Sequence, residues 1–171
     1  MKPLFAMLLW LIALTPVTIE SVNAEELETP KGKALLVVHG NIAHTNRDGA
    51  AHFDLAMLNA LPGRIATVQT PWTQGIVTFE GPLLRSVLDR VGASGSTLVI
   101  RALNDYSAEV PLSDAYELDT ILALKKNDQY MSIRDKGPIF LIYPFDKNPD
   151  VYNEKYFVRS VWQIREIEVV R

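Results

Sequence analysis

Short apolar runs of strand length recur along the chain, and turn-forming residues separate them. The strongest runs cover residues 34–40, 64–70, 97–103, 139–144 and 160–170, and they are rich in Val, Ile and Leu. Runs of this length bounded by Gly, Pro, Asn and Asp are typical of β-strands. The fold of this chain is therefore expected to be built around a β-sheet.

Helical spacing is confined to two main segments, 52–62 and 81–92. In the second, Pro82 is expected at the first helical position and Gly92 just past the end. A hairpin is expected around Asn127-Asp128, and Ser113 is expected to cap a brief helical turn. Because strands outnumber helices, we predict an α+β fold with a mixed β-sheet, a barrel-like core and flanking helices.

The first 24 residues have the layout of a secretory signal peptide. Lys2 precedes an apolar run over residues 4–14, and Val22-Asn23-Ala24 gives a small-x-small cleavage pattern. The run is too short to span a bilayer comfortably, although an uncleaved anchor remains the alternative. We therefore expect an exported protein in which residues 25–171 form one domain.

Composition excludes several kinds of site. The chain contains no cysteine, so it has no disulfide, thiolate metal ligand or cysteine nucleophile. Its net charge of −3 argues against a nucleic-acid partner, which would require a basic face. His39, His44 and His52 cluster in the sequence, but their spacing matches no familiar ligand motif, and we predict no metal site.

Polar and aromatic residues gather where the expected strands end. If these ends lie on one side of the sheet, they line one cleft. Such a cleft suits a flat, nitrogen-rich heterocycle, because rings stack, carboxylates accept N–H groups, and Arg or Lys meets an oxygen or phosphate. The candidate ligand-binding residues are Thr70, Trp72, Asn104, Asp105, Tyr106, Arg134, Lys136, Tyr143 and Trp162.

Most of these candidates also have a purely structural explanation. Trp72 could pack over the helix that follows Pro82, and Trp162 could be a core or rim aromatic residue. Asn104 and Asp105 are common turn formers. Residues 134–136 could form a solvated charged turn, and a core tyrosine with a satisfied hydroxyl is the default for a residue such as Tyr143.

Four segments in this order carry a resemblance to a known family: TFEGPLLRSVLDRVGA, TLVIRALNDYSAEVPL, MSIRDKGPIFLIYP and VRSVWQIREIEV. They resemble the sulfite-oxidase-type molybdopterin-binding domain, and especially its short exported members, from about Phe53 to Val169. The resemblance implies that fold and a pterin pocket. Family enzymes ligate molybdenum through a cysteine at the end of a strand. The matching region, Val68 to Trp72, has none, and this departure speaks against redox catalysis.

Some small exported members of this group are pterin-binding regulators. They bind a reduced pterin in the periplasm and contact the periplasmic part of an inner-membrane protein that makes or degrades cyclic di-GMP. The resemblance thus implies a periplasmic protein with a tetrahydropterin-like ligand, whose 2-amino and N3 groups Asp105 would recognise. Two alternatives stay open: a molybdopterin-dependent oxidoreductase subunit without the usual cysteine, and a protein-interaction domain with a vestigial pocket.

Overall fold

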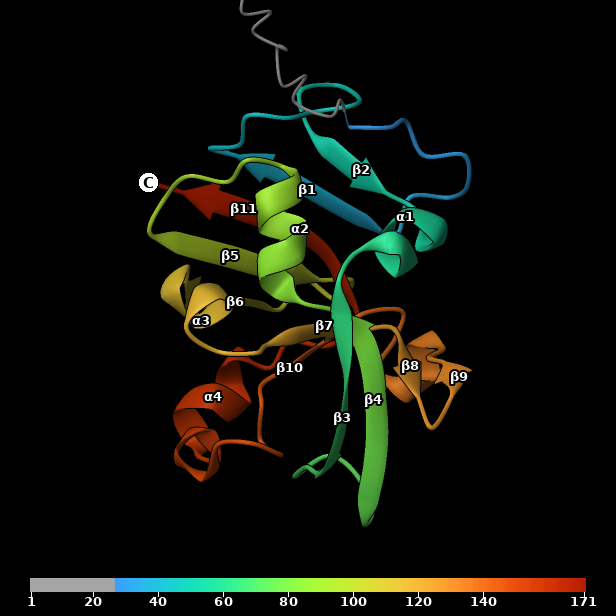
Figure 1. Ribbon diagram of the computed structural model, residues 1–171, viewed down its shortest axis with the longest axis vertical. Helices are drawn as coiled ribbons and strands as arrows, with labels where there is room; N and C mark the ends of the chain where they lie inside the picture. The colour runs from blue at the N-terminus through green and yellow to red at the C-terminus, as the bar shows by residue number, and fades with distance from the viewer. Residues whose placement is uncertain (1–26) are drawn as a thin grey trace, which may run out of the picture.

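Three β-sheets and four short α-helices make up residues 27–171, the part of the chain that this computed structural model describes (Figure 1). The predicted signal peptide, residues 1–24, lies outside the described residues. Within residues 27–171, no helix is long and apolar enough to cross a membrane. The α+β class predicted from the sequence is confirmed.

The largest sheet has five strands in the order β2-β1-β11-β5-β6. β1 and β11 run parallel, and the other neighbours are antiparallel. Parallel pairing places the first described strand beside the last one. Its strands are β1 (Leu36–Gly40), β2 (Ala51–Phe53), β5 (Thr97–Ala102), β6 (Ser107–Pro111) and β11 (Ile164–Val170).

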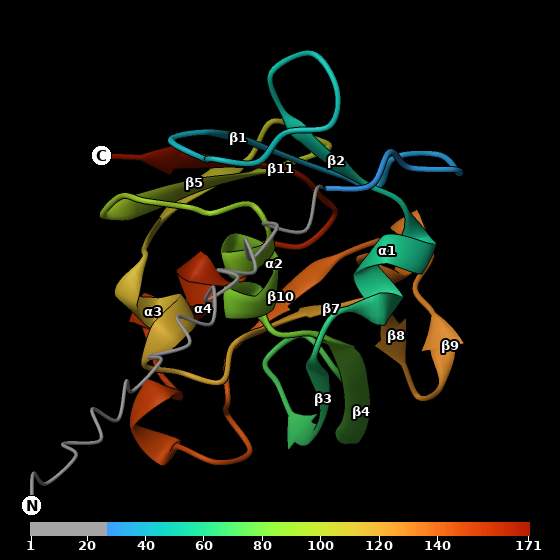
Figure 2. The same cartoon turned by 45° about the horizontal axis from the view of Figure 1, so that its top comes forward.

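Alternation of apolar and polar residues gives this sheet one buried face. In β5, Leu98 and Ile100 are fully buried, whereas Arg101 lies on the opposite face. There the Arg101 guanidinium donates to Glu166 at 2.7 Å and to Glu168 at 2.8 Å, both on neighbouring β11. Period-two patterning of this kind is typical of a half-buried sheet. Helix α2 (Leu84–Arg90) lies against the buried face (Figure 2).

The two smaller sheets carry the rest of the strands. Their orders are β3-β4-β8-β9 and β10-β7, and within the described residues the three sheets form no closed barrel. The hairpin expected at Asn127-Asp128 is confirmed, and both residues have the positive φ that a tight primed turn requires. The strands are β3 (Gly63–Gln69), β4 (Ile76–Pro82), β7 (Ile121–Ala123), β8 (Lys125–Lys126), β9 (Gln129–Tyr130) and β10 (Phe140–Ile142).

The helix beginnings differ from those predicted. Pro82 is the last residue of β4 rather than the first of α2, because the ladder with β3 continues through the bond from the Leu83 amide to the Pro62 carbonyl. Ser113 does not cap a helix; it is the first residue inside α3. The helical segments besides α2 are α1 (Leu55–Ala60), α3 (Ser113–Tyr116), α4 (Glu154–Arg159), and the 3₁₀ turns η1 (Ile133–Asp135) and η2 (Pro149–Val151).

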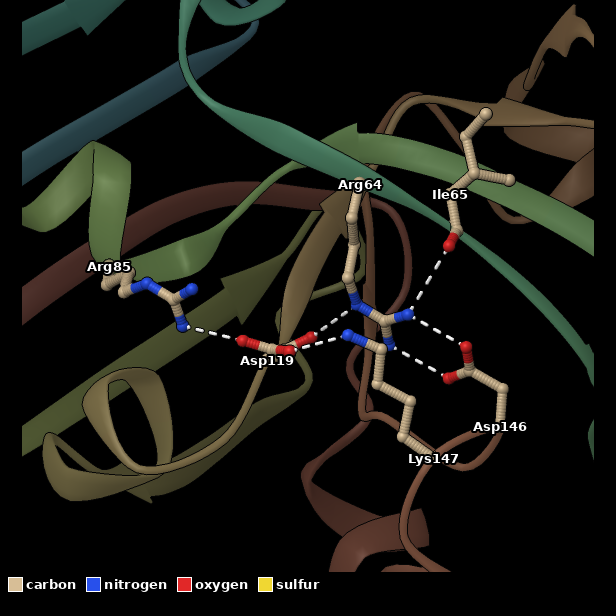
Figure 3. A network of polar contacts seen from close by, with 6 residues as sticks. All are labelled: Arg64, Ile65, Arg85, Asp119, Asp146 and Lys147. Atoms are coloured by element: carbon tan, nitrogen blue, oxygen red, sulfur yellow. Dashed lines mark hydrogen bonds and ion pairs between the residues drawn. The ribbon is translucent and has the colours of Figure 1, made fainter.

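A polar network joins β3, α2 and the loop that follows β10 (Figure 3). Arg64 makes two bonds to the Asp146 carboxylate, at 2.8 and 2.9 Å, and its Nε donates to the Asp119 carbonyl. The Asp119 carboxylate accepts from Arg85 at 3.0 Å and from Lys147 at 2.7 Å. Hydrogen bonds from these two cations lower the pKa of Asp119. Through these bonds the network holds β3 and the loop after β10 close to α2.

Candidate functional site

An aromatic cluster forms around Trp72, which lies in the turn between β3 and β4. Its ring centroid is 5.4 Å from that of Phe140, 5.7 Å from Phe157 and 6.1 Å from Trp162, in edge-to-face arrangements. Such pairs are favoured by the quadrupoles of the rings. The turn and α4 lie at the same end of the molecule (Figure 1), so the cluster joins segments far apart in the sequence.

A cavity of about 340 Å³ opens beside this cluster, and we call it the ring cavity. It lies among the β3–β4 turn, the β5–β6 turn, α4 and the segment before β11. The volume is within the usual range for small-ligand pockets, about 300–1,000 Å³. Its aromatic walls are Trp72, Tyr106, Phe157 and Trp162, and its polar side chains are Asn104, Tyr106, Glu154 and Ser160.

A second cavity of about 230 Å³ shares Trp72 with the first, and we call it the cationic cavity. Lys126, Arg134 and Lys136 line it. The Lys136 ammonium lies 4.4 Å from the ring centroid of Trp162, which lines the ring cavity. The two cavities are therefore neighbours. One offers mainly aromatic surface, and the other offers positive charge.

Most polar groups of the ring cavity are already hydrogen-bonded within the protein. The Asn104 side-chain oxygen accepts from the Tyr106 amide at 3.2 Å. The Tyr106 hydroxyl donates to the Val158 carbonyl at 2.9 Å, and the Ser160 hydroxyl donates to the Tyr156 carbonyl at 2.8 Å. Among the described residues, the carboxylate of Glu154 has no partner.

The structure brings six of the nine sequence-predicted residues to these two cavities. Four line the ring cavity, and the other two, together with the shared Trp72, line the cationic cavity. Within residues 27–171, Arg134 makes no hydrogen bond or ion pair through its side chain. The six residues are Trp72, Asn104, Tyr106, Trp162, Arg134 and Lys136.

Three predicted residues lie outside both cavities. Thr70 is buried, and its hydroxyl interacts with the Thr73 hydroxyl and the Trp72 amide within its own turn. Asp105 has φ +64 in the β5–β6 turn, and its largely exposed carboxylate accepts from Arg165 at 3.0 Å. Tyr143 is fully buried.

The Tyr143 hydroxyl belongs to a buried polar group in the core. It donates to the Asp114 carboxylate at 2.7 Å, and Arg159 donates to the same oxygen at 2.9 Å. Burial, followed by the bond to Asp114, raises the pKa of Tyr143 far above its ordinary value. The arrangement satisfies the hydroxyl within the core, and Tyr143 lines neither cavity.

Sequence reasoning missed α4, and with it Glu154 and Phe157 of the ring cavity. The local signal was Asn153, whose side chain accepts from the Lys155 amide and caps the helix. Asparagine followed by Glu and Lys is a common helix start. The helix has only six residues, so its apolar spacing gave no clear period.

The histidines are dispersed rather than gathered at a metal site. His39 lies 3.2 Å from Glu166, and His52 lies 2.7 Å from the guanidinium of Arg47. Desolvation by burial, followed by the charge of Arg47, lowers the pKa of His52. Residues 27–171 contain no group of three or more His, Cys, Asp or Glu side chains that could hold a metal ion.

An α+β domain with an aromatic-walled cavity of about 340 Å³ has room for a flat small molecule. The family described as the oxidoreductase molybdopterin binding domain matches residues 48–171, and the chain belongs to this family. None of the curated proteins matches the chain.

Solved structures with the same fold are known, and one of them can be compared in detail. The sulfane dehydrogenase SoxCD from Paracoccus pantotrophus is similar with a TM-score of 0.56 and 15% sequence identity. The match covers 79% of this chain and 37% of that one, so this chain spans just over a third of its relative. At this identity the similarity shows the fold alone.

The residues present do not fit a molybdenum centre held by a protein thiolate. The chain has no cysteine. In the region from Val68 to Trp72, where the family resemblance puts the metal-binding cysteine, Thr70 is buried and its hydroxyl is engaged in the turn. A hard hydroxyl oxygen is also a poor replacement for a soft thiolate ligand. The ring cavity lies beside this region and shares Trp72 with it.

Proposed function

We propose that this protein is an exported, periplasmic pterin-binding protein that senses a reduced pterin and regulates a membrane-bound cyclic-di-GMP signalling partner. The observation that carries the proposal is the ring cavity, whose walls include Trp72, Phe157 and Trp162. Aromatic walls with a few polar groups suit a flat heterocycle. Membership of a molybdopterin-binding family supports a pterin as that heterocycle.

The proposed regulation depends on side chains that line the ring cavity and are also exposed at the protein surface. Tyr106 is 48% exposed and Val158 is 56% exposed, and both line the ring cavity. A partner protein that contacts these side chains would meet different surfaces in the filled and empty forms. Ligand binding would then change the affinity for the partner by the ratio of the partner's affinities for the filled and empty forms.

The direct test is calorimetric titration of the apo protein with a tetrahydropterin under anoxic conditions, with folate as a comparison ligand. We expect saturable 1:1 binding of the tetrahydropterin. Trp72→Ala should weaken it about 5- to 150-fold, because loss of a stacking ring typically removes about 1–3 kcal/mol. Tyr130→Ala is the matched control, since this exposed aromatic residue lines neither cavity and its loss should leave the affinity unchanged.

Elemental analysis separates this proposal from the oxidoreductase alternative. Protein produced with added molybdate should contain no stoichiometric molybdenum, while chromatography of extracted material should yield a pterin. Molybdenum together with turnover of a redox substrate would overturn the sensing proposal. In the producing organism, Trp72→Ala should change cyclic di-GMP in the same direction as deletion of the gene.

A further inference from the structure

We infer that the ring cavity selects its ligand by a 2-amino-4-oxopyrimidine edge, with Glu154 as the specificity-determining carboxylate and Asn104 as its companion donor. The inference rests on the proposed function, because it names the chemical edge that the pterin presents. It assigns the recognition role to Glu154, at the start of α4.

Glu154 and Asn104 are side chains of the ring cavity with hydrogen-bonding groups that the described residues leave unused. Tyr106 and Ser160 use their hydroxyl protons within the protein. The Asn104 oxygen accepts from the Tyr106 amide, which orients the side chain and leaves its NH₂ group as a donor. The Glu154 carboxylate, unpartnered among the described residues, supplies two acceptor oxygens.

Other carboxylates near the site are already paired. Asp105 lies outside the cavity and accepts from Arg165. Asp135 lines the cationic cavity, where it accepts from the Ser132 hydroxyl at 2.9 Å and lies 3.7 Å from Lys126. Within residues 27–171, Glu154 is thus the one carboxylate that lines the ring cavity.

A pterin has the complementary set of groups on one edge of its pyrimidine ring. Its 2-amino group and N3–H are adjacent donors that match the two oxygens of a carboxylate. Its 4-oxo group is an acceptor that matches the NH₂ of an asparagine. Paired hydrogen bonds to an ionised carboxylate are among the stronger polar contacts, and they also fix the orientation of the ring.

Lumazine is the matched probe because it carries an oxo group in place of the 2-amino group. In the wild-type protein this oxygen would face the Glu154 carboxylate, so two acceptors would oppose each other without a proton between them. Glu154 is exposed, so water moderates this mismatch, and we expect the wild-type protein to prefer pterin over lumazine, at the same ring oxidation state, by about tenfold or more.

Glu154→Gln tests the assignment because glutamine presents one donor and one acceptor in nearly the same shape. The pterin-to-lumazine affinity ratio should fall about tenfold, chiefly through weaker pterin binding. Asp105→Asn is the matched control and should keep the wild-type ratio. Thermal unfolding of both variants checks that the fold is retained, which we expect because Glu154 has no partner to lose.

The outcomes distinguish the inference from the proposed function. A Glu154→Gln protein that binds pterin with an unchanged ratio overturns the role of Glu154 and leaves pterin binding intact. A wild-type protein that binds neither ring overturns both. Guanosine is the third ligand, because guanine carries the same edge; tighter binding of guanosine than of tetrahydropterin would overturn the pterin assignment.

Discussion

Tyr143 shows how one hydrogen bond decides the role of a side chain. Its hydroxyl donates to Asp114, which is 8% exposed and also accepts from Arg159. A carboxylate buried to this extent depends on its donors, because water does not replace them fully. Tyr143 therefore contributes to stability rather than to ligand contact.

Tyr143→Phe should lower the free energy of unfolding by about 1–3 kcal/mol, because Asp114 loses one of its two side-chain donors. Affinity for tetrahydropterin should stay within about twofold, since such a change is well under 1 kcal/mol. Denaturant unfolding and calorimetry measure the two quantities. Tyr156→Phe, at a half-buried ring packed on Tyr143, is the control and should have little effect on either. A large loss of affinity in Tyr143→Phe would contradict this account.

At the residue scale, the sequence indicated the aromatic and cationic residues of the site better than its carboxylate. Trp72 and Trp162 stand at strand ends, where large aromatic side chains meet cavities. Asp105 stands in a tight turn, and its left-handed backbone directs the carboxylate outward to Arg165. Turn geometry of this kind depends on the pairing of β5 with β6, and no local pattern reveals where the side chain points.

At the element scale, β4 is the strand that joins the small sheets. It pairs with β3 on one side and β8 on the other, and the Leu124 amide donates to the Glu80 carbonyl next to β7. Gly81 permits this approach, because a Cβ there would collide with the backbone of Leu122 and Ala123. The absence of a side chain is thus a packing requirement at this position.

Gly81→Ala should destabilise the protein by about 3 kcal/mol or more, because neither backbone can move aside without breaking the ladder. Gly32→Ala is the control. Its new Cβ would meet nothing closer than 3.4 Å, and its φ lies outside the left-handed region. We expect that control to change the free energy of unfolding by less than about 0.5 kcal/mol. Equal effects of the two substitutions would contradict the packing argument.

Asp119 links α2 to the loop after β10 through Arg85 and Lys147 (Figure 3). Its pKa is lowered, so its contribution to stability is complete above the unfolded pKa, about 4, and is lost as the pH falls through the folded value. Asp119→Asn should cost about 1 kcal/mol at pH 7, since these ion pairs are partly exposed.

The effect of Asp119→Asn should start to diminish below about pH 4, where the unfolded wild-type carboxylate takes up its proton, and should vanish only below the lowered folded pKa. Urea unfolding at pH 7 and at pH 3 measures the difference. Asp150→Asn provides the control, because within residues 27–171 the Asp150 side chain forms no ion pair. A penalty for Asp119→Asn that stays constant with pH would contradict the role assigned to the carboxylate.

Strands could be predicted from the sequence where a local run of apolar residues or a pair of turn-forming residues marks them. β1, β3, β5 and β11 follow apolar runs, and the β8–β9 hairpin follows its turn residues. The end of β4 at Pro82 and the six-residue α4 depend on contacts with distant segments, which no local period encodes. Within residues 27–171 the sheets form no closed barrel, and no local pattern reveals this, because sheet closure is decided by the pairing of non-adjacent strands.

At the scale of the whole molecule, the ring cavity is assembled from segments spread over the sequence. Its walls come from the turn that holds Trp72, the β5–β6 turn, α4 and the segment before β11. A ligand in this position contacts all of these segments in the folded state and none of them together in the unfolded chain. Ligand binding should therefore stabilise the domain as one unit.

Tetrahydropterin at about 100 times its dissociation constant should add about 2.7 kcal/mol to the free energy of unfolding. For a domain of this size, that corresponds to a rise in Tm of about 5–10 °C. Scanning calorimetry should show one transition that moves as a whole. Trp72→Ala at the same ligand concentration should show a smaller shift. A wild-type transition that does not move would contradict ligand binding at the ring cavity.

The positions of the indoles have a practical consequence. Of the three tryptophans, Trp10 lies within the predicted signal peptide, and the other two, Trp72 and Trp162, both line the ring cavity with centroids 6.1 Å apart. In a chain that starts at residue 25, all indole fluorescence would come from this pair. A heterocycle stacked there would quench that emission, so under the proposed function the two indoles would report occupancy of the ring cavity optically.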